Sequence, residues 1–491
     1  MLPFASLLVR CRWARRISAL ARTPPIPHEL WGTIPPAAQA AVRAVLAALQ
    51  QQVDELRGEL AGLRGRLNRD SSNSPVPPSA DPPSAESAPP RAPGGKRKGG
   101  QPGHPRALRP LLPADATHDL KPKRCRRGRH RLSGVDPNPL VRQVHEIPAV
   151  RPHVTEYRRH RLAGTHCATA TCAELPAEAA TGYGPRAQAV CALRSGGCRL
   201  GQRAVGLTCG DLFGLPISPA AVCGLEAKTA AALQPVAEEA LAYTRGEPAN
   251  VDETGWKQGR RSAWLWAAVT SQVTAFLVRL TRGRAAFDDR VGGTPGVLTT
   301  DRYRVYDHLR VDRRQLCWAH LRRDFRAMID RQNAGSVVGE EVPTYADIAL
   351  DRWGRVRDGT LSRAGFQRRY VSWVRPGVRG FRDRGAACGC AKTAATGREL
   401  LRVEASLWTF AAVEGGEPTN NAAERAVRHA VCWRKTSCGT GSEGGSRFVE
   451  RVLTVIASCR QQDRSVMTFR TEAIQAARAG LKMPSLVPAG A

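Results

Sequence analysis

The segment NVDETGWKQGRRSAWLWAAVTSQVTAFLVRL, residues 250–280, decides the fold that we predict for this 491-residue chain. It contains three short runs rich in Val, Trp, Thr and Phe, at residues 250–256, 262–270 and 274–280, which are separated by short turns. Runs of this composition are typical of β-strands, and adjacent runs joined by tight turns predict an antiparallel meander. The first predicted strand carries Asp252.

The residues that follow extend this sheet. We predict a short helix near residues 285–290, a buried strand VLTTD at 297–301 that ends on Asp301, a helical YRVYDHL, and a fifth strand in RQLCWAHL at 314–321 that runs into a basic helix. Three strands, helix, strand, helix, strand is the order of a ribonuclease H-like fold. We therefore predict a multidomain α+β protein whose ribonuclease H-like α/β core has its first part at 250–329, a helical insertion at 330–415 and its C-terminal part at 416–480.

A third acid follows the predicted insertion. After Pro418, Asn420 or Asn421 can cap a helix through AAERAVRHAV, which places Glu424 in or just after its first turn. Phosphodiester cleavage is served by two divalent ions about 3.5–4 Å apart, and Mg²⁺ and Mn²⁺ prefer carboxylate oxygens. We therefore predict Asp252, Asp301 and Glu424 as catalytic residues and as ligands of two Mg²⁺ or Mn²⁺ ions. Glu253 stands beside Asp252, and strand phase favours Asp252.

The charge balance predicts a polyanionic partner. Lys and Arg total 74 against 43 Asp and Glu, a formal net charge of +31, and basic side chains that neutralise phosphates release condensed counterions. A GC-rich genome that raises the Arg content is the alternative explanation. We predict double-stranded DNA as the partner, and the predicted phosphate contacts are Lys96, Arg97, Lys98, Arg425, Arg428, Arg434 and Lys435. For the four basic residues that follow Glu424, the alternative to DNA contact is an ordinary ion pair of Glu424 with Arg428 on one face of a helix.

The N-terminal part is predicted to lie outside any globular core. Residues 1–36 form a basic extension, and residues 37–69 form a leucine-zipper-like helix with alternating spacings of four and three between apolar residues. This apolar seam predicts self-association, a homodimer or higher oligomer, and packing back on the same chain is the alternative. Residues 70–106 form a Ser/Pro-rich and then basic linker, because this composition cannot bury a core.

Two small regions precede the predicted core. Residues 107–175 form a zinc-finger-like region with four candidate Zn²⁺ ligands, and a site that has lost zinc is the alternative; the ligands are Cys125, His130, Cys167 and Cys172. Residues 187–245 form a helical DNA-binding region. In it an apolar face of Val205, Leu207 and Leu212 is followed by Gly214 as turn residue and Ser218 as N-cap of a second helix. This is a helix-turn-helix arrangement, although other helical hairpins share the pattern.

Several motifs resemble transposases of the insertion sequence 66 family, which have DDE-type catalytic domains. They span roughly residues 40–475 and read SSNSPVPPSADPP, GGQPGHP, VDETGW, TDRYRVYDHL, CWAHLRRDF and PTNNAAERAVRHAVCWRKTSCGTGSEGGSRF. The resemblance implies that Asp252, Asp301 and Glu424 are the DDE acids and that a zinc-finger-like region covers residues 119–173. Gly128 stands where that region's second Cys would be. Cys317 and His320 resemble a Cys and His that other DDE enzymes place between the second Asp and the Glu, and core packing is the alternative role.

The resemblance also implies a mechanism and a setting. Such an enzyme binds the ends of its element, hydrolyses a phosphodiester to leave a 3′-hydroxyl, and directs that hydroxyl at target DNA; accessory proteins of the same element are further candidate partners. No apolar run approaches the roughly 20 residues of a membrane span, so we expect a bacterial cytoplasmic protein associated with the nucleoid. The alternatives are a catalytically inactive DNA-binding repressor derived from a transposase and a metal-dependent nuclease without strand transfer.

Overall fold

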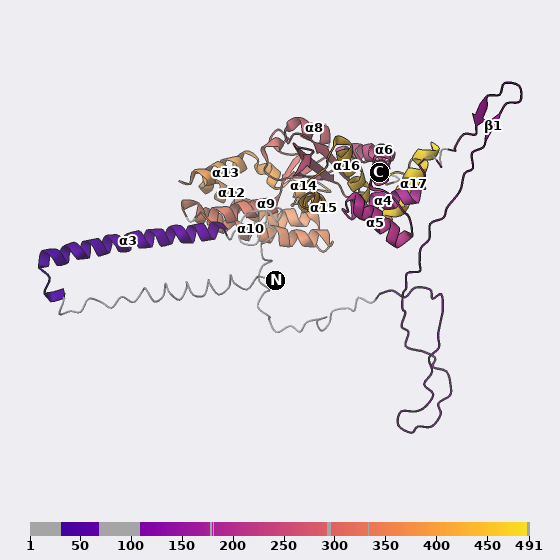
Figure 1. Ribbon diagram of the computed structural model, residues 1–491. Coiled ribbons are helices and arrows are strands. Elements are labelled where there is room, and N and C mark those ends of the chain that lie inside the picture. The colour runs from indigo at the N-terminus through magenta and orange to yellow at the C-terminus, as the bar shows by residue number, and fades with distance from the viewer. Residues whose placement is uncertain are drawn as a thin grey trace. The chain divides into compact units, whose positions relative to one another are not determined.

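The computed structural model describes residues 31–67, 109–176, 179, 181–291, 296–331 and 333–488 (Figure 1). The chain divides into two units, Met1–Val76 and Pro77–Ala491, which are described separately below. The predicted basic linker with Lys96, Arg97 and Lys98 lies outside the described residues. Within the described ranges, each helix is too short or too polar to cross a membrane.

The first unit contains one long helix, α3 (Pro36–Leu67), where the zipper-like helix is predicted. Its apolar residues are exposed along the part of the helix whose side chains are described, with exposed fractions of 37% for Val42, 52% for Leu49 and 64% for Leu56. A 32-residue helix is about 48 Å long at 1.5 Å per residue, which is enough for several heptads. The helix itself is therefore confirmed, and its self-association remains a prediction.

The second unit is a mixed α+β structure built on a five-stranded sheet. The strands are β3 (Ala249–Gln258), β4 (Arg261–Val269), β5 (Thr274–Arg279), β6 (Leu298–Thr300) and β7 (Arg314–Leu316), in the order β5-β4-β3-β6-β7. The first three form the predicted antiparallel meander, whereas β6 and β7 pair in parallel fashion beside β3. The predicted helix after the meander is α8 (Arg284–Val291), and the predicted helical YRVYDHL contains a single 3₁₀ turn at Arg304–Tyr306.

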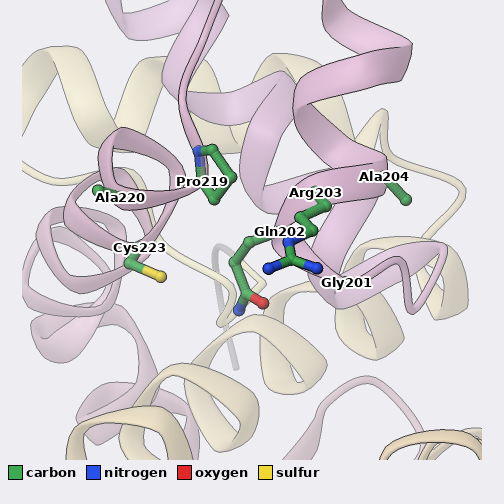
Figure 2. Close-up of a pocket in the computed structure, with 7 residues that line it drawn as sticks. All are labelled: Gly201, Gln202, Arg203, Ala204, Pro219, Ala220 and Cys223. Atoms are coloured by element: carbon green, nitrogen blue, oxygen red, sulfur yellow. The ribbon is translucent and has the colours of Figure 1, made fainter.

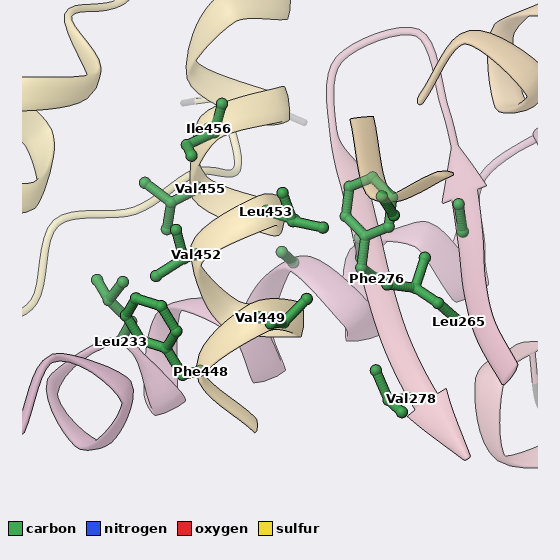
Figure 3. Packing of buried hydrophobic residues seen from close by; sticks show 14 of the residues in the cluster. Leu233, Leu265, Phe276, Val278, Phe448, Val449, Val452, Leu453, Val455 and Ile456 are labelled. Carbon is green, nitrogen blue, oxygen red and sulfur yellow. The ribbon is translucent and has the colours of Figure 1, made fainter. Parts of the chain in front are cut away.

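Two layers of helices cover this sheet. On one face, α15 (Asn421–Ser437), α16 (Glu443–Gln461) and α17 (Val466–Ala479) join α7 (Gln234–Gly246) in a core that includes Phe276, Phe448 and Val452 (Figure 3). On the other face, α8 and the 3₁₀ turn pack through Phe287 and Tyr306. Because neighbouring residues of a strand point to opposite faces, alternate residues of β3 belong to the two cores. Val251 lies in one core and Trp256 in the other.

Helix α16 completes the open edge of the sheet with side chains instead of a strand. Alternate amides of β5 donate to residues spaced four apart on α16: Val278 N to Glu450 Oε2 at 2.9 Å, Phe276 N to Thr454 Oγ1 at 3.0 Å, and Thr274 N to Ser458 Oγ at 3.0 Å. An uncovered edge would expose unpaired backbone groups to other chains. Helix α16 therefore accepts the hydrogen bonds of the β5 amides and also shields this edge from pairing with other chains.

The predicted insertion is helical, as expected. It follows α9 (Trp318–Ile329), the predicted basic helix after the fifth strand, and contains α10 (Ala334–Arg357), α11 (Arg363–Phe366), α12 (Ser372–Ala386), α13 (Ala391–Arg402) and α14 (Thr409–Ala412). Aromatic side chains form its core, among them Trp353 and Phe381. Helices α12 and α13 approach closely at Gly397, where a Cβ atom would lie 2.4 Å from the backbone nitrogen of Ala386. A glycine is therefore required at that contact.

The helical region before the sheet contains the predicted hairpin. Helix α4 (Pro185–Ala192) precedes α5 (Gln202–Phe213), which ends at Gly214 with a φ of 59°, and α6 (Pro219–Ala232) begins after Ser218, whose side chain accepts from Ala221 N. The predicted apolar face is wrong in part. Val205 is buried, but Leu207 and Leu212 are 68% and 51% exposed, because Cys209, one turn after Val205, faces the core instead.

Residues 109–176 contain little regular structure. One hairpin pairs β1 (Arg161–Ala163) with β2 (Ala170–Cys172), and an isolated bridge joins Arg124 and Arg131. The bridge closes a turn that contains Cys125 and His130, and the hairpin closes one that contains Cys167.

Candidate functional site

The sheet register brings the two predicted aspartates to the same level. Strands β3 and β6 pair with Ala249 opposite Leu298 and Asn250 opposite Thr299. Continued by two residues, this parallel register places Asp252 opposite Asp301. Residues at matched positions of neighbouring strands point to the same face. Asp252 therefore belongs to the sheet face that α15 covers, since Trp256, four residues later on the same strand, packs on Trp433 of α15 with ring centroids 6.3 Å apart.

The neighbouring acid, Glu253, faces the other side of the sheet. Its Oε2 accepts a 2.6 Å hydrogen bond from the hydroxyl of Tyr306, and its Oε1 accepts from Nε of Arg282 at 2.8 Å. The Arg282 guanidinium in turn lies over the ring of Tyr303, 3.8 Å from its centroid. The carboxylate of Glu253 is thus held in a buried hydrogen-bond network with Tyr306 and Arg282. The phase argument that favours Asp252 over Glu253 agrees with these contacts.

Asn420 ties the start of α15 to the sheet beside Asp252. The side-chain Nδ2 of Asn420 donates to the carbonyl of Val251 at 3.0 Å, and its backbone N donates to the thiol of Cys317 at 3.1 Å. Asn420 occupies the N-cap position, as predicted, but its side chain reaches the strand and makes no capping hydrogen bond to the helix. The first turn of α15, which contains Glu424, is therefore held next to β3.

Cys317 and His320 have distinct surroundings. Burial raises the pKa of Cys317 to about 11, so its thiol stays protonated and serves as the acceptor for Asn420 N. His320 lies on α9 with its Nε2 3.3 Å from Oε1 of Glu424. Burial and the charge of Arg323 lower its pKa, against the opposing effect of Asp301 and Glu424. Core packing accounts for Cys317, whereas His320 contacts one of the predicted acids.

Glu424 is in contact with α9. Its Oε1 lies 2.7 Å from Nη2 of Arg323, on the same oxygen that His320 approaches. The alternative pair of Glu424 with Arg428 is thus replaced by a pair with Arg323. Sequence reasoning missed Arg323, because the contact joins residues 101 positions apart and no local spacing predicts it.

The electrostatics of the three acids fit a divalent cation. Burial raises the pKa of Asp252 well above its usual range, and the negative charges of Glu253, Asp301 and Glu424 raise it further. Asp252 is therefore a buried acid among negatively charged neighbours. Among the described residues, however, His, Cys, Asp and Glu side chains do not come close enough in a group of three to hold one ion. The carboxylate donors suit Mg²⁺ or Mn²⁺, but a ready-made cage would require side-chain movement.

The residue after Asp301 connects the sheet to the insertion. Arg302 Nε lies 3.0 Å from Asp324 on α9, and its Nη1 lies 3.2 Å from Glu399 on α13. Asp301 itself accepts from Tyr303 N at 2.8 Å. Buried Arg314 donates to the carbonyl of Asp301 at 3.0 Å. The loop that carries Asp301 is therefore fixed by contacts from both the sheet and the helical insertion.

The predicted basic residues of α15 divide into two groups. Arg425, Arg428 and Lys435 are exposed, as DNA-phosphate contacts require. Arg434 is half-buried, and its Nη1 donates to the carbonyl of Gly255 at 2.7 Å. Arg434 therefore serves to join α15 to β3.

The four candidate zinc ligands occupy two separate turns. Cys125 Sγ accepts from Gly128 N at 3.5 Å within a turn that also contains His130, whereas Cys167 and Cys172 belong to the β1–β2 hairpin. Hydrogen bonds lower the pKa of Cys125, through Gly128 and Arg127, and of Cys167, through Thr169. Thiolates are the form that binds zinc. In the described part of the chain, the four residues do not gather into one ligand group.

A shallow hollow lies between the first turns of α5 and α6 (Figure 2). Its volume is about 540 Å³, and it is lined by Gly201, Gln202, Arg203, Ala204, Pro219, Ala220 and Cys223. The Arg203 side chain is exposed at this hollow. None of the predicted acids of the sheet lines it, and Arg203 is the charged residue among those that do.

Asp252 lies on β3, Asp301 directly follows the neighbouring strand β6, and α15 carries Glu424 together with exposed basic residues. Residues 208–447 match the family model described as Transposase IS66 family, which is the family that the motifs resemble. The matched range includes Asp252, Asp301 and Glu424.

The chain is also similar to a curated protein. The "Uncharacterized protein y4qI" of Sinorhizobium fredii (strain NBRC 101917 / NGR234) is 28% identical over 224 residues, which cover 40% of this chain and 40% of that protein. The chain thus aligns with less than half the length of this relative.

Proposed function

We propose that this chain is the transposase of a bacterial insertion sequence, which binds the ends of its element and catalyses metal-dependent DNA cleavage and strand transfer. Asp252, Asp301 and Glu424 would be the catalytic acids of a ribonuclease H-like core. The observation that supports the proposal is the parallel register of β3 and β6, which, continued by two residues, would bring the two aspartates to the same level. The strand order β5-β4-β3-β6-β7 supports such a core.

The three acids would hold two Mg²⁺ or Mn²⁺ ions. When bound, such ions neutralise charge on the attacking and leaving oxygens and acidify the attacking water. In the first reaction, the water oxygen bonds to phosphorus, the bond to the 3′-oxygen breaks, and a 3′-hydroxyl is released. In the second, that hydroxyl attacks a target phosphodiester in the same way. Asn420 would keep Glu424 in reach of the strand-borne acids throughout, because it fixes the start of α15 to Val251.

Other parts of the chain would bind DNA. Arg425, Arg428 and Lys435 lie exposed on α15, within three turns of Glu424, and would contact the phosphates near the cleaved bond. The α5–α6 hairpin with Arg203 would bind the element ends, together with the basic linker at 70–106. Zinc bound by Cys125, His130, Cys167 and Cys172 would order residues 107–175, which precede the hairpin.

Transposition requires two DNA ends to be brought together. An oligomer joined through α3 would do this, and accessory proteins of the same element are further candidate partners.

The test uses duplex DNA that carries the inverted repeats flanking the gene, with Mg²⁺ or Mn²⁺. The variants Asp252→Asn, Asp301→Asn and Glu424→Gln should each bind the ends but lose nicking by at least about 100-fold, the scale of losing a group that acts in the transition state. Asp288→Asn, an exposed acid of α8 that pairs with Arg284, is the matched control and should retain activity.

Two results would redirect this assignment. Nicking at the wild-type rate in all three variants would show that the acids are misassigned. A wild-type chain that binds the ends but never nicks them with either metal would instead be a DNA-binding repressor. Nicking without joining to a target would define a nuclease.

A further inference from the structure

The carboxylate of Glu424 contacts a permanently charged side chain. Its Oε1 lies 2.7 Å from Nη2 of Arg323, and both side chains are largely shielded from solvent, with exposed fractions of 34% and 25%. His320, one turn earlier on α9, approaches the same oxygen at 3.3 Å. Arginine keeps its charge at every pH of interest, so this contact persists across the working range of the protein.

The contact occurs where the fold has a surplus of negative charge. Glu253 is neutralised by Arg282, whereas Asp252 has no described ion pair, and Asp301 is held by backbone and side-chain hydrogen bonds. The Arg323 guanidinium is therefore a cation in direct contact with a predicted ligand, and it occupies an oxygen that an ion would need. Within the described ranges, the acids do not form a group tight enough for one ion.

We propose that Arg323 holds Glu424 on α9 while no divalent ion is bound and releases it to the ion when one binds. This inference rests on the proposed function of the three acids. Once released, the guanidinium stands beside the site with its donors free, and its planar fork is suited to two oxygens of a DNA phosphate. Arg323 is then a positioning residue for Glu424 in the ion-free chain and a phosphate ligand in the loaded complex.

Arg322 provides a matched control on the same helix. Its Nη2 lies 2.7 Å from Asp347 of α10, so an Arg322→Ala change removes an ion pair of equal length that does not involve the acids. Arg323→Lys keeps the charge but cannot present a planar fork. Glu424→Gln removes the predicted ligand itself.

The experiment measures Mn²⁺ binding to the full chain by isothermal titration calorimetry without DNA. Loss of a partly exposed ion pair that competes with the metal should tighten Mn²⁺ binding about fivefold in Arg323→Ala. Arg323→Lys should lie between this variant and wild type, and Arg322→Ala should bind as wild type does. Cleavage of end DNA should nevertheless fall in Arg323→Ala, because the phosphate ligand is lost. Tighter metal binding together with slower cleavage is a combination that a purely structural tie would not produce.

The outcomes separate this inference from the proposed function. Unchanged Mn²⁺ binding in Glu424→Gln would show that the ligand assignment itself is wrong. Weaker binding in Glu424→Gln, with unchanged or weaker binding in Arg323→Ala, would overturn the role of Arg323 and leave the ligands intact. If circular dichroism shows that Arg323→Ala does not fold, Arg323→Lys decides: wild-type Mn²⁺ affinity in that variant contradicts the inference.

Discussion

Replacing Thr454 by Val tests whether α16 acts as the missing neighbour of the edge strand. Thr454 Oγ1 accepts from Phe276 N at 3.0 Å and donates to the carbonyl of Glu450 at 2.7 Å, and the residue is 1% exposed. Valine has nearly the same shape but no acceptor. The change therefore leaves the buried amide of Phe276 without its partner.

The expected cost follows from that orphaned amide. A buried donor that loses its partner costs about 1–3 kcal/mol, because it was desolvated in exchange for that hydrogen bond. The same energy corresponds to roughly a 5- to 150-fold change in the equilibrium for opening the strand edge. Loss of the hydroxyl's own donation to Glu450 adds little, since that carbonyl is an ordinary helix acceptor.

Hydrogen exchange measured by mass spectrometry reports the effect locally, in peptides that cover residues 274–279. Local opening is the suitable quantity because a chain of several parts need not unfold in two states. Thr471→Val on α17 is the matched control: its hydroxyl donates to the carbonyl of Met467 at 2.8 Å, as Thr454 does to Glu450, but no strand amide depends on it. Equal protection of residues 274–279 in both variants would refute the account of α16 as a substitute strand.

Three further predictions concern charge and packing. Asp252→Asn should raise the free energy of unfolding at pH 7 in the absence of metal, because burial and neighbouring acids raise the pKa of Asp252, and it should abolish stabilisation by Mn²⁺ in thermal melts. Burial also raises the pKa of Glu450 above its ordinary value of 4.5. The contribution of Glu450 to the free energy of unfolding is therefore fully present below pH 4.5 and is lost as the pH rises through the pKa of the folded state. In urea unfolding, the stability of Glu450→Gln should depend less on pH across that window than the stability of the wild type. Gly397→Ala should destabilise the insertion by about 1–3 kcal/mol through overpacking, whereas Gly380→Ala, whose Cβ would meet only Arg384 Nη1 at 3.5 Å, should be neutral or stabilising in the same assay.

Local signals in the sequence were sufficient for most elements of the sheet. The runs of β-branched and aromatic residues predicted all five strands within one to five residues, because a strand's composition follows from its burial. Ser218 and Gly214 marked the hairpin for equally local reasons, a cap and a left-handed turn. The apolar face of α5 was wrong because burial depends on which helix packs against it, and Leu207 faces solvent.

Contacts between distant segments were beyond the reach of such signals. Asn420 was predicted as a helix cap, a local role, whereas its side chain reaches Val251, 169 positions earlier. The partners of Glu424 on α9 and the hydrogen bonds of α16 to β5 are of the same kind. Each depends on where a helix lies in space, and hydrophobic periodicity reports which face is buried but not which polar group it meets.

This difference bears on how the proposed site is assembled. Asp252 lies on β3 and Asp301 directly follows β6, the strand that pairs with it, a feature the strand pattern could anticipate, whereas Glu424 depends on contacts of α15 with β3 and α9. Arg302 joins the loop of Asp301 to Glu399 on α13, and Asn420 joins α15 to β3. Because the insertion contributes to the loop of one acid and precedes the helix of another, a fault in its packing should displace both. Of the three predicted acids, Glu424 is therefore the one whose position can change most easily. Its contact with Arg323 can for this reason control whether Glu424 reaches a bound ion.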